Sequence, residues 1–139
     1  MYTENNIIDI EKAIEIYRES NMSTLSMMEY VILLLNGLRK NVQLCGEAII
    51  ANNAEQRDHS LQKAQQFIFE LMTTIDHDAE DSEKHLLLYI HLNQCLVNVK
   101  LTKTDRKIAH VDEIIQQLIA SWEVAKQVTR RRNFQTDQL

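Results

Sequence analysis

The chain has 139 residues, a size that suits a single domain able to bury one substantial core. It contains no proline and only two glycines, and this scarcity of turn-forming residues excludes a β-sandwich, a barrel or a set of tight hairpins. The formal net charge of -5 disfavours non-specific binding to nucleic acid or to anionic lipid. Long helices joined by polar loops remain as the expected architecture.

The first predicted helix is short and amphipathic. Ile7, Ile10, Ile14 and Tyr17 follow one another at spacings of three or four residues, which places them on one helical face. The N-terminus lacks the basic region, apolar run and cleavage site of a signal peptide. We therefore predict that residues 1–22 form an amphipathic helix with a connecting segment, and that the protein is cytoplasmic.

The second predicted helix contains the most apolar run of the chain, the six residues YVILLL that begin at Tyr30. A membrane span needs about 20 mainly apolar residues, so this run predicts a core helix and no membrane insertion. Ser26 and Glu29 have the spacing of a capping box, so the helix should start there and run to about Ala51. Gly37 lies mid-helix, at a cost of about 1 kcal/mol relative to Ala, so we expect another backbone to approach it closely.

Three more amphipathic helices follow. The third should begin near Asp58 and end at the acidic loop that starts at Asp76. The fourth should begin near Ser82. Its expected core-facing residues are Leu86, Leu87, Ile90, Leu96, Val97 and Leu101. The last should begin near Thr104 and end before a polar tail at residues 133–139.

These elements predict an all-α fold, an antiparallel four-helix bundle with a short additional N-terminal helix. The expected parts are the N-terminal residues 1–22, the bundle at residues 23–132 and the polar tail at residues 133–139. The basic cluster at residues 130–132 would then occupy the last turn of the last helix, where cations complement the helix dipole.

The residues show no pattern typical of an enzyme. No Glu-x-x-His pair of the kind that di-iron bundles use is present, and neither is a Gly-x-Ser-x-Gly elbow. Cys45 and Cys95 lie in apolar helical patterns and predict free core thiols. Cys95 and His91 could meet on one helix face, as could His110 and Glu113, but neither pair alone indicates a site.

We therefore predict no catalytic residues, no metal ligands and no cofactor, with a metal-binding helical-bundle enzyme as the less favoured alternative. A helical protein with excess apolar surface commonly works by accepting another helix in a groove.

Several short motifs occur in a fixed order along the chain. Tyr17 is followed by Met22, by TLSM at residues 24–27 and by LLNGL at residues 34–38. KAQQFIFELMTTID at residues 63–76 is the longest of these motifs. Together they resemble the patterns Y-x-x-x-x-apolar-x-T-A-S-P, L-Y-D-G-A and K-A-Q-x-I-I-x-E-L-x-x-x-L-D of the flagellin export chaperones, the FliS family.

The resemblance covers about three quarters of the chain, from Tyr17 to Trp122. Met27 replaces the Pro of the family pattern, and Leu35 and Asn36 replace its Tyr and Asp. These departures indicate a divergent member.

The resemblance implies a cytoplasmic bundle that binds the disordered C-terminal segment of flagellin in an apolar helical groove and prevents premature polymerisation. Export-apparatus proteins are a further implied class of partner, and an export adaptor or co-chaperone paralogue with a different cargo is the main alternative. The segment containing Tyr17 and Met22 would cover the groove when cargo is absent. Packing of the helix from Ile7 to Tyr17 on the bundle, without covering a groove, is an equally weighted alternative. For Ile32 and Leu35, a place in the core fits the helical spacing equally well. The predicted cargo-binding residues are Tyr17, Met22, Ile32, Leu35, Asn36, Ile90, Asn93, Leu96, Val97 and Lys100.

Overall fold

A computed structural model describes residue 12 and residues 23–138 of the chain. Residues 23–138 form helices and no strand, which confirms the all-α class. The helices are α2 (Thr24–Ile50), α3 (Ala54–Thr73), α4 (Ser82–Thr102) and α5 (Ile108–Gln138). The predicted N-terminal helix lies outside the described residues.

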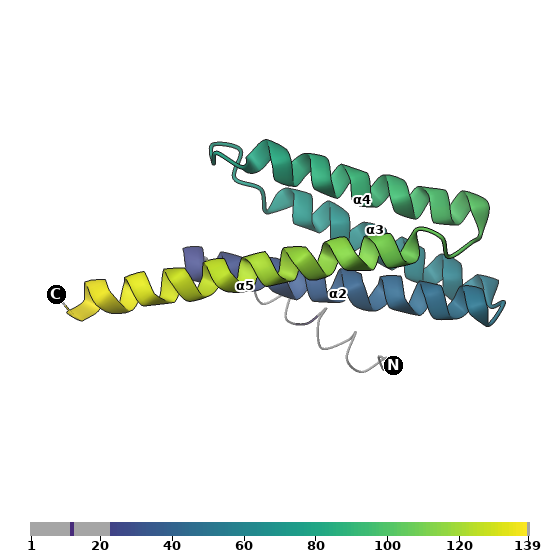
Figure 1. Cartoon of the computed structure of the whole chain (residues 1–139), viewed down its shortest axis with the longest axis horizontal. Coiled ribbons are helices and arrows are strands. Elements are labelled where there is room, and N and C mark those ends of the chain that lie inside the picture. The colour runs from purple at the N-terminus through teal and green to yellow at the C-terminus, as the bar shows by residue number, and fades with distance from the viewer. Residues whose placement is uncertain (1–11, 13–22, 139) are drawn as a thin grey trace.

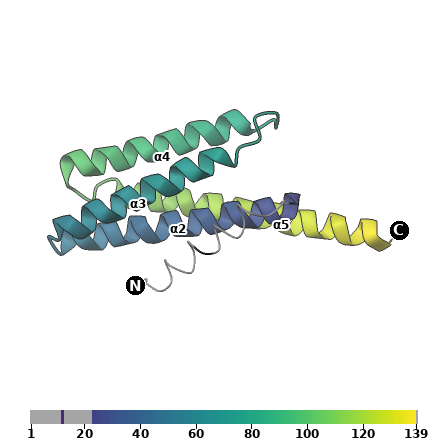
Figure 2. The ribbon, with the colours of Figure 1, turned by 180° about the vertical axis from the view of Figure 1, so that it is seen from behind.

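Consecutive helices run in alternating directions along the long axis of the molecule (Figure 1). α2 packs against α3 and α5, while α4 lies at one edge of the bundle and packs against α3 and, less extensively, α5 (Figures 1 and 2). The C-terminal part of α5 extends beyond the other helices in both views. Within the described part of the chain, no helix combines the length and the apolarity that crossing a membrane would need.

α2 is the central helix, and this position explains its apolar run. Tyr30, Val31, Ile32, Leu34 and Leu35 are all buried, although six successive residues face every side of a helix. Because α2 has α3 on one side and α5 on another, apolar side chains on several of its faces find partners. The run is therefore part of the core.

Ion pairs join α5 to α2 at two well-separated points. Arg39 Nε lies 3.0 Å from Asp112 Oδ1, and Arg130 Nη2 lies 3.0 Å from Glu29 Oε1 near the start of α2. All four side chains keep some contact with water, so each pair contributes at most about 1 kcal/mol. The pairs mainly fix how α5 lies along α2.

The helix ends differ from those that the sequence predicted. α2 starts three residues early because the Ser23 hydroxyl accepts a hydrogen bond from the Ser26 amide at 3.2 Å, so the capping box expected at Ser26 was wrong. α3 likewise starts after Asn53, whose side chain accepts from the Gln56 amide. α5 continues to Gln138, so the basic cluster at residues 130–132 does not lie in its last turn.

A hydrogen bond between helices gives a testable contribution to stability. The buried Tyr30 hydroxyl donates to Glu70 Oε1 on α3. We expect Tyr30→Phe to lower the free energy of unfolding by about 1 to 2 kcal/mol, because a hydrogen bond to a carboxylate is lost at a partly buried site. Urea denaturation followed by circular dichroism measures this change.

Tyr89→Phe is the matched control for that experiment. Tyr89 is equally buried, and its burial raises the pKa of the phenol to about 12, but its hydroxyl has no hydrogen-bond partner among the described residues. The control should change stability by less than about 0.5 kcal/mol. Equal losses in the two variants would show that the bond to Glu70 is not the cause.

Candidate functional site

α4 is apolar on two opposite faces. One face packs into the core through Tyr89, Leu92, Cys95, Leu96 and Val99. The opposite face carries four large apolar side chains that are exposed to solvent. They are Leu87 (58 % exposed), Ile90 (38 %), Val97 (38 %) and Leu101 (76 %), and we call them the α4 stripe.

The α4 stripe has the dimensions of a docking surface for a helix. At about 100° per residue its four members fall within an arc of roughly 80° on α4. At about 1.5 Å per residue they span roughly 21 Å of its length. Between Leu87 and Leu101 only Gln94 places a polar side chain on this arc. A helix with an uncovered apolar stripe of this length is typical of a surface that binds a partner.

Polar residues border the α4 stripe on both sides. Towards α3, Asn93 Oδ1 accepts a hydrogen bond from Gln65 Nε2 at 3.2 Å, and the exposed Lys100 lies on the same flank. Towards α5, His91 Nε2 lies 3.0 Å from His110 Nε2. An apolar centre with a polar rim is the usual anatomy of a protein-binding patch.

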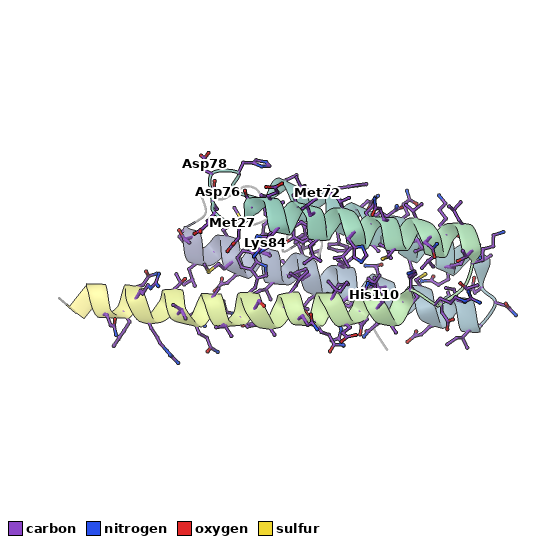
Figure 3. All side chains as sticks on the ribbon, turned by 45° about the horizontal axis from the view of Figure 1, so that its top comes forward. Met27, Met72, Asp76, Asp78, Lys84 and His110 are labelled. Atoms are coloured by element: carbon purple, nitrogen blue, oxygen red, sulfur yellow. The ribbon has the colours of Figure 1, made fainter. Side chains whose placement is uncertain are left out.

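An apolar hollow lies at the end of the bundle where α2 begins. It is a cavity of about 520 Å³ lined in part by Met27, Ile75, Tyr89 and Trp122. Figure 3 shows Met27 at this end together with the loop that precedes α4. Trp122 stacks at a tilt on His85, with ring centroids 5.6 Å apart, and closes one side of the hollow. This hollow offers a second apolar surface beyond the α4 stripe.

The structure brings four of the predicted cargo-binding residues together on the exposed side of α4. Ile90 and Val97 belong to the α4 stripe, and Asn93 and Lys100 to its flank. Leu96 is 1 % exposed and faces the core.

On α2, the predicted residues lie in or near the core. Ile32 and Leu35 are buried, and Asn36 is half-buried with its amide donating to the Ile32 carbonyl. Tyr17 and Met22 lie outside the described residues.

The predicted core face of α4 was wrong in part. Leu87 and Leu101 were expected only in the core, yet both belong to the exposed stripe. Ile90 and Val97 were predicted both as core-facing and as cargo-binding residues, and they lie on the exposed side, while Leu86 is half-buried. Leu87 and Leu101 were therefore missed as candidate site residues. The signal was present in the sequence, because both continue the helical spacing of Ile90 and Val97.

Both cysteines are free thiols, as predicted. Burial raises the pKa of the Cys45 thiol to about 11, which makes it a poor nucleophile near neutral pH. Burial also raises the pKa of the Cys95 thiol above its usual value, and the positive charge of the nearby Lys107 offsets only part of that rise. Cys95 lies beside His91, as the helical spacing allowed, and His110 of α5 joins them, which the spacing did not predict.

Comparison with known proteins agrees with the motifs in the sequence. The family model described as "Flagellar protein FliS" matches residues 10–129. A curated relative, the "Flagellar secretion chaperone FliS" of Bacillus subtilis (strain 168), is 26 % identical over 115 residues. That match covers 83 % of this chain and 86 % of the relative.

Proposed function

Because the chain belongs to the FliS family of flagellar proteins, we propose that it is a flagellar export chaperone that binds the disordered C-terminal segment of flagellin on the α4 stripe. The bound segment would fold into a helix whose apolar face covers the stripe. Holding that segment would prevent premature polymerisation of flagellin in the cytoplasm. The proposed role involves no catalytic step.

The observation that carries the proposal is the second apolar face of α4. A helix that only had to complete the bundle would need one apolar face, and the core already covers it. The exposed face repeats the same helical spacing in large aliphatic residues, which are the side chains that anchor amphipathic helices. Its polar flanks, including Asn93 and Lys100, can pair with the polar edge of a bound helix.

The α4 stripe is small, so the free energy of binding that it can contribute alone is limited. Burying one Leu, Ile or Val side chain completely is worth about 1.5 to 3 kcal/mol, and these four are about half exposed, so covering them yields roughly 3 to 6 kcal/mol. Folding a disordered segment on binding costs about 2 to 5 kcal/mol. The cargo must therefore make further contacts, and the hollow lined by Met27 and Trp122 provides apolar surface for them.

The predicted α2 residues fit this proposal as a secondary contact. Ile32 and Leu35 are buried in the free protein, so cargo reaches them only if the packing over them opens. We therefore assign the first contact to the α4 stripe.

Titration of the purified chain with a synthetic flagellin C-terminal peptide tests the function. We expect a 1:1 complex by calorimetry and a gain of helical circular dichroism beyond the sum of the two components, because the peptide folds as it binds. A peptide of the same composition in scrambled order is the control. If the cognate peptide released no heat and gained no helix, the chain would not be a flagellin chaperone. Binding to export-apparatus proteins alone would then point to the adaptor role.

A further inference from the structure

Three side chains with metal-binding atoms meet where α4 passes the start of α5. His91 and Cys95 lie one turn apart on α4, and His110 lies in the first turn of α5. Cys95 Sγ is 3.6 Å from His91 Nε2, and the two histidine Nε2 atoms are 3.0 Å apart. Ligand atoms of all three residues lie within 4.8 Å of one another.

The two separations that involve His91 match the edges of a small tetrahedral metal site. With Zn–N bonds of about 2.0 Å and Zn–S bonds of about 2.3 Å, two imidazole nitrogens lie about 3.3 Å apart, and a sulfur and a nitrogen about 3.5 Å apart. The two separations that involve His91 differ from these by about 0.3 Å or less, and the third edge, between Cys95 and His110, is at most 4.8 Å long. A cation could therefore bind all three ligands if the exposed His110 side chain moved closer to Cys95.

The ligand types select the class of metal. Calcium and magnesium need several oxygen ligands, and this group supplies no carboxylate. Two imidazoles and a thiolate suit borderline and soft transition metals, and zinc accepts a compact four-coordinate site without a further geometric demand. We propose that His91, Cys95 and His110 bind one zinc ion, with water or a small anion as the fourth ligand.

The surroundings give solvent access to the site and also limit its affinity. His110 lines an open cavity of about 680 Å³, so a metal ion and its fourth ligand can reach the ring. Arg106 and Lys107 line the same cavity, and their positive charges disfavour a cation nearby. The negative charge of the Cys95 thiolate offsets this repulsion in the metal-bound state.

A zinc ion here would join two helices that otherwise share little surface. Of the two described helices that α4 packs against, α5 makes the smaller contact and α3 the larger one. The ion would hold the middle of α4, the helix that carries the α4 stripe, against the beginning of α5. The site itself stands independently of the proposed cargo, because none of its three ligands belongs to the stripe.

Metal titration of the full-length protein tests the site. The chain is first stripped with a chelator, then titrated with zinc chloride by calorimetry and, separately, with cobalt(II) by absorbance. We expect one saturable zinc site and a cobalt complex with visible bands of tetrahedral geometry and a near-ultraviolet thiolate charge-transfer band. Zinc at about 100 times its dissociation constant should raise the melting temperature by about 5 °C or more, because it binds only the folded chain.

Variants distinguish this site from chance binding to surface histidines. His110→Ala alters an exposed side chain and should weaken zinc binding about 100-fold, whereas Cys95→Ser should abolish the thiolate band. His59→Ala changes an exposed histidine on α3 and should leave zinc affinity unchanged. The proposal would be overturned if no saturable binding occurred, if the cobalt complex lacked a thiolate band, or if His110→Ala bound zinc as tightly as the unaltered chain.

Discussion

Replacing Leu87 and Leu101 together by glutamate should weaken binding of a flagellin C-terminal peptide by at least about 100-fold. These two are the most exposed members of the α4 stripe, at 58 % and 76 %. Covering each contributes about 1 to 2 kcal/mol, and a glutamate in its place would have to give up water against an apolar partner. Calorimetry and the peptide-induced gain of helix both report the loss.

The double variant should fold normally, which separates lost binding from lost structure. Both side chains project into solvent, and glutamate is a good helix former, so the free energy of unfolding should change by less than about 1 kcal/mol. Circular dichroism and thermal unfolding of the free variant check this point.

Val124→Glu is the matched control for the loss of binding. Val124 is 62 % exposed on α5 and lies outside the α4 stripe, so its replacement should change peptide affinity by no more than about twofold. If the stripe variant kept full affinity, the α4 stripe would not be the cargo site. If Val124→Glu lost as much as the stripe variant, general charge effects would explain both.

The fold class was accessible from the sequence because composition and periodicity agreed. α3 has one dominant set of buried positions, and most of the apolar run of α2 is buried, as predicted for a core helix. α4 was different, since apolar residues line two opposite faces and periodicity alone cannot say which face meets the core. Only the placement of α3 and α5 decides that Leu92 and Val99 point inward while Leu87 and Leu101 face solvent.

Contacts between distant residues account for the remaining differences. Glu29 was expected to cap α2 together with Ser26, but it pairs with Arg130 of α5. The spacing of His91 and Cys95 was visible in the sequence, whereas the approach of His110 depends on how the α4 to α5 connection places the two helices. Neither the Glu29–Arg130 pair nor the approach of His110 to His91 can be predicted from a local sequence pattern, because each joins two different helices.

For Gly37, the sequence correctly predicted a close approach, but the group that approaches is a side chain and not a backbone. Its mid-helix position predicted close approach of another backbone. The structure instead places the ring of Phe67 from α3 against it, and a Cβ added at Gly37 would lie 2.5 Å from two atoms of that ring. α2 and α3 can therefore pack this closely only because residue 37 has no side chain.

Gly37→Ala should consequently destabilise the protein by up to about 2 kcal/mol, although alanine is the better helix former. Overpacking in a core costs about 1 to 3 kcal/mol, and the gain in helix propensity of about 1 kcal/mol offsets part of it. Phe67 is 6 % exposed and packed in the core, so its ring cannot move away freely. Urea denaturation followed by circular dichroism measures the change.

Gly46→Ala on the same helix is the control, with the opposite expected sign. Its new Cβ would meet only Ile108 Cγ2, at 3.2 Å, and that methyl group can shift by a few tenths of an ångström. Helix propensity then dominates, so this variant should gain up to about 1 kcal/mol. A Gly37→Ala protein as stable as Gly46→Ala would contradict the steric explanation.

In the converse test, Phe67→Leu should cost less stability in the Gly37→Ala background than in the unaltered chain, because the smaller side chain relieves the clash that the new methyl group creates.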